Sequence, residues 1–195
     1  MSVKRIERLV VGVTGASGAV YAKRLLEVLN EKNIETHIIV SKTAEKIINH
    51  ELEMSRVEFE KLGRYSYRED EVDAPLSSGS FKTDGMIIIP CSLKTLAGIA
   101  CGYTDNLILR AADVTLKEKR TLILVPRETP LNAIHLHNML KLARIGVIIL
   151  PAMPAFYHKP KKIEELVDFI VGKILDLLGI EHQLFKRWSR QFSEY

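Results

Sequence analysis

The sequence has little of what several classes of protein require. Its only cysteines are Cys91 and Cys101, so we expect no disulfide framework and a reducing, cytoplasmic environment. The six histidines are scattered and no paired cysteines accompany them, which argues against a metal site. No basic block carries interleaved aromatic residues, so we expect no nucleic-acid partner. Residues 1–8 precede only a short apolar run, which predicts neither a signal peptide nor a membrane span.

The remaining composition is typical of one globular domain. The chain has 195 residues, of which 47% are hydrophobic and 27% charged, enough for a substantial core in a single domain spanning residues 1–195. The net charge of +4 and the isoelectric point near 9.0 favour small anionic ligands.

The stretch from residue 9 to residue 29 has the form strand, glycine turn, helix. An apolar run at 9–13 leads into a loop with Gly12, Gly15 and Gly18, and a helical pattern follows at once. The first N–H groups of such a helix attract negative charge, and Ser17 could cap the helix or bind a phosphate oxygen. We interpret the loop as an anion cradle, with a simple tight turn as the alternative.

Two features argue against binding of plain NAD at this loop. The spacing G-x-x-G-x-x-G departs from the dinucleotide fingerprint. The second apolar run is followed by Ser41 and Lys42, where a classical NAD site has an acidic residue for the ribose. A hydroxyl and an ammonium group suit a phosphate or a flavin better.

Apolar runs and helical patterns alternate along the rest of the chain. Further strands are predicted at 34–40, 86–89, 121–125 and 146–150, and further helices at 41–51, 92–100, 105–119, 134–145 and 163–178. Residues 52–78 have no clear period and receive no element. The alternation predicts an α/β fold, a doubly wound parallel sheet of Rossmann-like or flavodoxin-like type with helices on both faces.

Polar residues follow the predicted strands. Because the carboxyl ends of parallel strands share one edge of the sheet, five of these residues should gather there: Ser17, Ser41, Ser92, Arg127 and Tyr157. Ser92 stands where a helix N-cap is expected. Arg127 and Glu128 stand in a loop between two prolines, which favours a site over a solvated charge pair. Cys91 precedes the same helix as Ser92, and a small buried hydrophobe is favoured there over a reactive thiol.

Six blocks together resemble the UbiX-type flavin prenyltransferases, formerly described as aromatic-acid or polyprenyl-hydroxybenzoate decarboxylases. They are VGVTGASGAVYAKRLL, SKTA, SSGSF, IIPCSLKTLAGIACGYTDNLILRAADVTLKEKR, PRETPLNAIHLHNM and LPAMPAFYHKP. The resemblance runs from residue 9 to about 180, with a weak stretch at 52–77. It implies a metal-independent transferase that joins the dimethylallyl group of dimethylallyl phosphate to N5 and C6 of reduced FMN. The product, prenylated FMN, would serve UbiD-type decarboxylases, and the enzyme would be a homo-oligomer, usually a dodecamer, with sites at subunit interfaces.

The matching motifs also imply roles for individual residues. The implied FMN contacts are Gly15, Ala16, Ser17, Ser41, Ser92, Leu93, Lys94, Thr95 and Arg127. The implied contacts of the prenyl donor are Arg110, Lys117, Tyr157 and Lys173. Catalytic roles fall to Ser17, Glu51, Lys117 and Glu128, with the two carboxyl groups as candidates for moving protons.

Several alternatives remain at this point. Some family members have Arg in place of Lys173, and only Arg offers a planar bidentate fork to phosphate. Arg110 could instead form an ion pair with Asp113 one helical turn away. A flavin-dependent cysteine decarboxylase would have a histidine in the first helix region, and residues 16–30 contain none. A non-catalytic FMN carrier or an accessory subunit of a decarboxylase is the other alternative. The tail at about 180–195, which contains Trp188, is expected to pack at a subunit interface.

Overall fold

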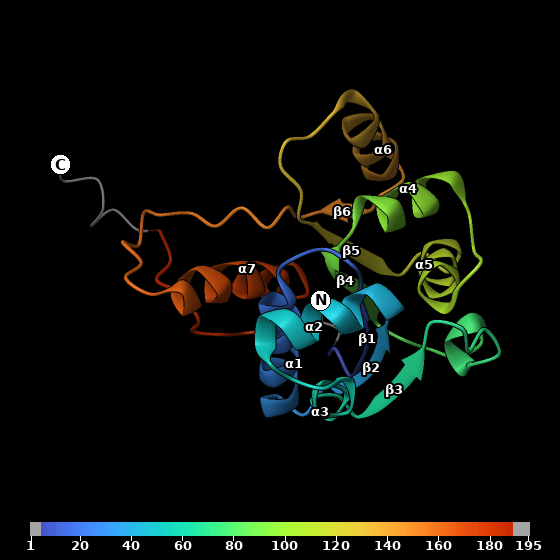
Figure 1. The fold of residues 1–195 in the computed structure, drawn as a ribbon, viewed down its shortest axis with the longest axis horizontal. Helices are drawn as coiled ribbons and strands as arrows, with labels where there is room; N and C mark the ends of the chain where they lie inside the picture. The colour runs from blue at the N-terminus through green and yellow to red at the C-terminus, as the bar shows by residue number, and fades with distance from the viewer. Residues whose placement is uncertain (1–4, 189–195) are drawn as a thin grey trace.

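A parallel sheet of six strands forms the centre of the computed structural model, which describes residues 5–188 of the chain (Figure 1). The strands are β1 (Arg8–Val13), β2 (Glu35–Val40), β3 (Tyr65–Arg68), β4 (Gly85–Cys91), β5 (Thr121–Pro126) and β6 (Ile148–Ile149). Their order across the sheet is β3-β2-β1-β4-β5-β6, and every neighbouring pair is parallel. The predicted doubly wound parallel sheet is confirmed. The order reverses between β1 and β4, which is where such sheets bind ligands.

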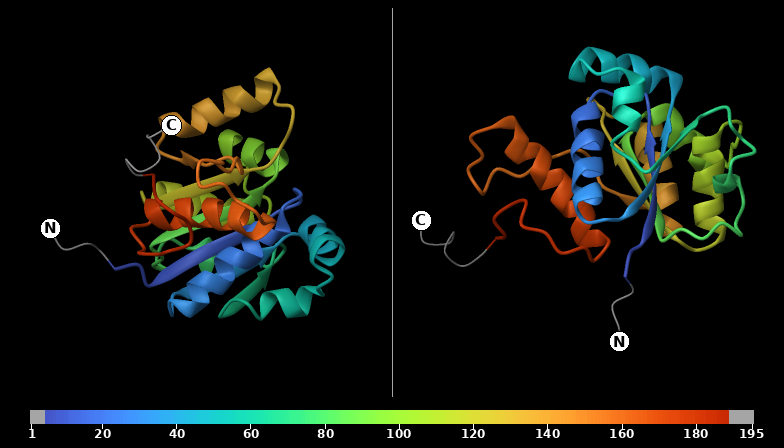
Figure 2. Two further views of the ribbon diagram at one scale, coloured as in Figure 1. Left: turned by 90° about the vertical axis from the view of Figure 1, so that its left-hand side faces the viewer. Right: turned by 90° about the horizontal axis from the view of Figure 1, so that it is seen from below.

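Helices cover both faces of this sheet. They are α1 (Ala19–Glu31), α2 (Lys42–Leu52), α3 (Arg56–Glu60), α4 (Leu93–Cys101), α5 (Leu107–Lys117), α6 (Ala133–Arg144) and α7 (Ile163–Leu177), with a short 3-10 turn η1 (Pro75–Ser77). Core residues of α1, α2 and α7 share one hydrophobic cluster, and those of α4, α5 and α6 share the other. The right-hand view in Figure 2 shows α7 and α5 on opposite sides of the sheet.

Alternation along the strands produces these two cores. In β1, Val11 and Val13 face the α1 side, whereas Val10 faces the α5 side, and all three are buried. In β2, Ile38 faces the α1 side and Ile39 the other. Strands buried on both faces read as continuous apolar runs, which is why the sequence revealed them.

The main difference from expectation lies in residues 52–78. This stretch contains α3, the edge strand β3 and η1, none of which the sequence pattern indicated. Three of the four residues of β3 are exposed, so the strand has no apolar run or alternation by which to recognise it. The neighbouring β2, in contrast, is almost entirely buried.

The chain beyond α7 returns along that helix as far as residue 188. Asp176 receives hydrogen bonds from His182 at 3.1 Å and from Arg187 at 2.7 Å. Gly172 provides the room, because a Cβ added there would lie 2.5 Å from a ring carbon of Phe185. Residues 189–195 lie outside the described part of the chain, and the predicted interface role of the tail stays a prediction.

Among the described residues, no helix combines the length and apolar character that crossing a membrane requires.

Candidate functional site

A cavity of about 150 Å³ opens at the carboxyl ends of β1, β2 and β4; we call it the rim cavity. It is lined by Thr14, Gly15, Ser41, Thr43, Glu69, Ser92, Lys94, Thr95, Asn106 and Ile108. Five of the residues predicted to contact FMN therefore come together: Gly15, Ser41, Ser92, Lys94 and Thr95. Hydroxyl groups and one ammonium group dominate this lining, which suits a polyol or a phosphate.

Thr14 holds the ends of β1 and β4 together at this cavity. Its buried hydroxyl donates to the Pro90 carbonyl at 2.8 Å and accepts from the Ser92 N–H at 2.7 Å. Ser92 in turn caps α4, accepting from the Thr95 N–H at 3.3 Å. The predicted N-cap is confirmed, and it fixes the hydroxyls of Ser92 and Thr95 3.0 Å apart.

Ser41 at the start of α2 and Gly15 in the loop after β1 form another part of the lining of the rim cavity. Ser41 caps α2 by accepting from the Ala44 N–H at 3.1 Å. A Cβ added at Gly15 would lie 2.4 Å from Cγ2 of Thr43, so the glycine loop runs too close to this side chain for any other residue at position 15. A larger residue at position 15 would push Thr43 into the space that a ligand needs.

The N-terminus of α1 differs from the prediction. Its N-cap is Gly18, in the left-handed region with φ of 110°, which has no side chain of its own to cap the helix. The carboxylate of Glu51, which lies within α2, accepts hydrogen bonds from the N–H groups of Gly18 at 2.9 Å and Ala19 at 2.8 Å. The anion cradle exists, but it holds a carboxylate of the chain itself, and Ser17 is not the helix cap.

This arrangement controls the charge of Glu51. Partial burial raises the pKa of its carboxyl group, but hydrogen bonds from Ser17, Gly18 and Ala19 and the charge of Arg127 outweigh burial and hold the pKa below its ordinary value. Glu51 is therefore ionised at neutral pH.

Arg127 joins the loop after β5 to the loop after β1. Its Nε donates to the Ser17 carbonyl at 3.1 Å, while the carboxylate of Glu128 accepts from the Thr129 N–H at 3.1 Å. Ser17, Glu51 and Arg127 thus form a polar cluster two residues along the chain from Gly15. Of the five strand-end residues, Ser41 and Ser92 line the rim cavity and Ser17 meets Arg127 beside it. Tyr157 does not join them, because it lies in the longer loop after β6 and lines another cavity.

The residues predicted to bind the prenyl donor are divided between the two faces of the sheet. Arg110 and Lys117 belong to α5, and Lys173 belongs to α7. The predicted ion pair of Arg110 with Asp113 is confirmed at 3.1 Å. Lys117 lies 3.4 Å from Glu118, and Lys173 lies 3.8 Å from Asp176. None of the three lines the rim cavity.

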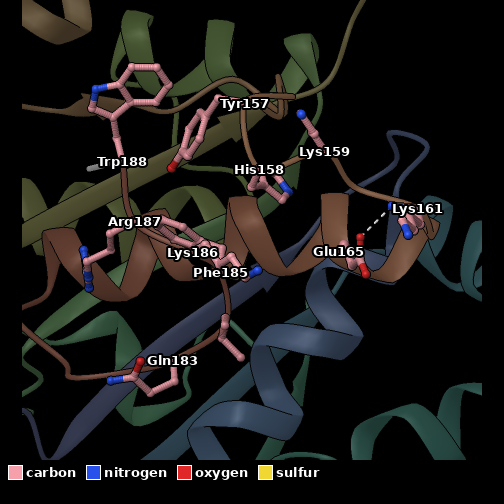
Figure 3. A pocket seen from close by; sticks show the side chains of 11 residues that line it. Tyr157, His158, Lys159, Lys161, Glu165, Gln183, Phe185, Lys186, Arg187 and Trp188 are labelled. Atoms are coloured by element: carbon pink, nitrogen blue, oxygen red, sulfur yellow. Dashed lines mark hydrogen bonds between the residues drawn. The ribbon is translucent and has the colours of Figure 1, made fainter. Parts of the chain in front are cut away.

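Tyr157 belongs to a second and larger cavity, of about 1150 Å³, between the loop after β6 and the tail after α7 (Figure 3). We call it the Tyr157 cavity. Its lining includes four cations: Lys159, Lys161, Lys186 and Arg187. The ring of Trp188 meets that of Tyr157 edge-on, with 5.3 Å between centroids.

Cys91 is fully buried, and burial raises the pKa of its thiol well above the ordinary range. The inert reading of this cysteine is confirmed. In the part of the chain that the structure describes, no three His, Cys, Asp or Glu side chains cluster closely enough to bind a metal ion.

Four polar lining residues of the rim cavity were not singled out by sequence reasoning: Thr14, Thr43, Glu69 and Asn106. Thr14 and Thr43 stand inside two of the blocks that carry the resemblance. Asn106 caps α5 by accepting from the Leu109 N–H at 3.0 Å, and Asn before an apolar helical pattern is a recognisable cap. Glu69 stands in the stretch without a pattern, so no signal was available for it.

Comparison with known proteins finds one matching family and relatives that share about half of the sequence. Residues 2–175 match the Flavoprotein family. The flavin prenyltransferase UbiX of Methanocaldococcus jannaschii is 51% identical over 182 residues, which cover 93% of this chain and 98% of that protein. A probable UbiX-like flavin prenyltransferase of Bacillus subtilis is 53% identical, covering 93% of this chain and 89% of that protein.

Solved structures agree. The crystal structure of AnUbiX in complex with FMN and dimethylallyl pyrophosphate has a TM-score of 0.93 at 48% identity, covering 95% of this chain and 98% of that one. A dodecameric, FMN-dependent UbiX-like decarboxylase of Escherichia coli O157:H7 has a TM-score of 0.92 at 50% identity, covering 93% and 99%. The FMN-dependent cysteine decarboxylase SpaF, at 20% identity and a TM-score of 0.61, shares the fold alone. The identity and the coverage together show that the chain belongs to the UbiX flavin prenyltransferases, a group of transferases within the Flavoprotein family.

Proposed function

We propose that this protein joins the dimethylallyl group of dimethylallyl phosphate to N5 and C6 of reduced FMN, and releases prenylated FMN. The observation that carries the proposal is the rim cavity, whose hydroxyl-rich lining stands directly beside the cluster of Ser17, Glu51 and Arg127. A cavity suited to the ribityl phosphate of FMN thus adjoins a cluster whose charged side chains could take part in the reaction. The relatives named above support the same reaction.

The rim cavity fits the ribityl phosphate of FMN. The hydroxyls of Ser41, Ser92 and Thr95 and the ammonium of Lys94 surround a space that Gly15 keeps open. Gly15, Ala16 and Ser17 would pass along the flavin, with Leu93 at the start of α4 and Arg127 on the far side of the loop. Reduced FMN supplies the nucleophilic N5 and C6 atoms, and Ser17 would orient N5 through a hydrogen bond.

The prenyl donor would be bound through its phosphate. As the C–O bond breaks, charge accumulates on the departing phosphate, and the cations of Lys117, Lys173 and Arg110 together with the Tyr157 hydroxyl would stabilise it. Since α5 and α7 lie on opposite faces of one sheet, these residues meet only if different copies contribute them. We therefore propose a homo-oligomer, a dodecamer like its Escherichia coli relative, with interface sites.

The exposed surface supports assembly. On α6, the apolar residues Leu136 and Leu140, which lie one helical turn apart on one face, are 53% and 49% exposed. A second copy would cover such a face, and the tail at 180–195 is proposed to pack at an interface as well.

The two carboxyl groups would move protons in different ways. Glu51 is ionised at neutral pH, so its carboxylate would accept a proton during closure of the second bond, although the backbone N–H groups that it binds lower its basicity. Glu128, in the loop beside Arg127, would be the partner that delivers one. Replacing Glu128 by Gln should leave FMN binding intact and slow ring closure.

The deciding experiment is anaerobic incubation of the protein with reduced FMN and dimethylallyl phosphate, followed by mass spectrometry of the flavin. A flavin heavier by one prenyl unit establishes the transferase. Tightly bound but unmodified FMN, with either the mono- or the diphosphate donor, would leave a non-catalytic carrier or an accessory subunit. Product from the diphosphate alone would keep the reaction and replace the donor.

A complementation experiment tests the shared site. Co-assembly of Lys117→Ala chains with Lys173→Ala chains should restore part of the activity that each variant lacks alone, because some interfaces then contain both intact residues. Equal inactivity of the mixed oligomers would contradict a site shared between copies.

The product would pass to a UbiD-type decarboxylase in the cytoplasm. The two free cysteines, one of them exposed, support a reducing compartment.

A further inference from the structure

His158 lies beside Tyr157 on the loop between β6 and α7 (Figure 3). Its ring packs in a slot made by the rings of Tyr157 and Phe169. Its ring stacks on Phe169 of α7, with 5.6 Å between centroids and 5° between planes. The ring of Tyr157 meets it edge-on at 5.5 Å. Contacts on the face and on the edge therefore fix both the position and the plane of the imidazole.

Both ring nitrogens of His158 are buried, and neither has a hydrogen-bond partner among the described residues. A neutral imidazole always presents one N–H donor and one acceptor nitrogen, and buried polar atoms in proteins are nearly always paired. The aromatic walls of the slot can satisfy neither nitrogen. The part of the chain that the structure describes thus holds a desolvated donor whose partner must come from outside that part.

The surroundings select an anion as that partner. Among the described residues, the lining of the Tyr157 cavity contains His158, the cations Lys159, Lys161, Lys186 and Arg187, and one acid, Glu165. Glu165 accepts the backbone N–H of Lys161 at 2.6 Å, and Arg187 is paired with Asp176. The remaining charge is still positive, which raises the local concentration of anionic ligands.

We propose that His158 is a further binding residue for the phosphate of the prenyl donor, its ring N–H donating to a phosphate oxygen beside the Tyr157 hydroxyl. This inference rests on the proposed function. The stack on Phe169 fixes the ring before the donor arrives, so that little side-chain freedom is lost on binding.

The test uses the full-length protein and the variant His158→Phe. Phenylalanine keeps the stack on Phe169 and removes both nitrogens. We expect the KM for dimethylallyl phosphate to rise about tenfold, as for loss of one hydrogen bond to a charged group, with kcat and FMN affinity little changed. Because the nitrogens have no partner between residues 5 and 188, the variant should unfold at the same or a higher temperature. His158→Asn, which keeps an N–H donor, should show a smaller rise in KM, and the exposed His50→Asn should show none.

Binding is measured separately from turnover. Dimethylallyl phosphate should protect the FMN-loaded wild type against heating, and His158→Phe should lose most of this protection. Inorganic phosphate should be weakened as an inhibitor by the same factor, whereas the alcohol that lacks phosphate should be unaffected.

The outcomes separate this inference from the proposed function. If the wild type is protected by the donor but forms no prenylated FMN, the proposed reaction fails and the phosphate contact can still be measured by protection. Unchanged KM and unchanged protection in His158→Phe would overturn the contact alone. A variant that unfolds at a lower temperature, or that changes oligomer mass, would show that the nitrogens pair with another copy and would likewise overturn it.

Discussion

Removal of the charge of Glu51 should destabilise the protein in a pH-dependent manner. The carboxylate accepts two N–H groups at the start of α1, at 2.9 and 2.8 Å, and so links α2 to that helix. Its pKa lies below the ordinary value of 4.5. A carboxyl group whose pKa is lowered by folding contributes stability above its unfolded pKa, and this contribution disappears as pH falls through the folded pKa.

The magnitude follows from the geometry. Losing a helix cap costs about 1 kcal/mol, and a charge near a helix N-terminus contributes about 0.3–1 kcal/mol. The side chain of Glu51 is exposed on one side, so solvent screening reduces the charge part. Glu51→Gln keeps an acceptor oxygen and should lose about 0.5 kcal/mol at pH 7, whereas Glu51→Ala should lose about 1 kcal/mol.

Urea unfolding at fixed subunit concentration measures this effect at pH 7 and again below pH 4. The difference between wild type and Glu51→Gln should shrink towards zero at the lower pH. Glu31→Gln, at the opposite end of α1, is the matched control and should change little at either pH. Equal stability of Glu51→Gln and wild type at pH 7, or a difference that does not vary with pH, would refute the role assigned to the carboxylate.

Three further predictions concern the rim cavity and its surroundings. Gly15→Ala should weaken FMN binding at least tenfold in a fluorescence titration, because its Cβ would lie 2.4 Å from the Thr43 side chain, and Thr43→Ala in the same chain should restore part of the affinity. Ser92→Ala should cost about 1 kcal/mol in urea unfolding through loss of the α4 cap, and no loss would contradict that cap. In the native protein a thiol reagent should modify the exposed Cys101 and leave the buried Cys91 intact, whereas rapid labelling of both would contradict the burial.

The sequence was sufficient for most of the framework because its strands are buried on both faces. Apolar runs marked β1, β2, β4 and β5, and glycines and hydroxyls marked the loops at their carboxyl ends. The edge strand β3 could not be recognised, since three of its four residues are exposed. Propensity alone offers no signal for a four-residue exposed strand that is held by pairing with β2.

Half of the residues that line the rim cavity were predicted from the sequence, but the contacts that arrange them were not. Hydroxyls that follow strands were bound to meet at one edge of a parallel sheet, and Ser41 and Ser92 do meet there. The contact of Glu51 with α1 joins residues 32 and 33 positions apart, and no local pattern encodes it. Lys117 and Lys173 are separated because α5 and α7 cover different faces of the sheet. The face that a helix covers is set by the topology of the sheet, and the sequence of the helix alone does not reveal it.

The helix ends at the rim show how FMN would be oriented. The N-terminus of α1 is occupied by the carboxylate of Glu51, and that of α2 receives the carboxylate of Glu69 on the Lys42 N–H at 2.9 Å. A phosphate would be repelled from both. The N-terminus of α4, in contrast, is capped by the neutral hydroxyl of Ser92 and has Lys94 in its first turn, so its positive dipole end is retained. The flavin phosphate is therefore expected at α4, which leaves the carboxylate of Glu69, across the same cavity, to accept hydrogen bonds from the ribityl hydroxyls.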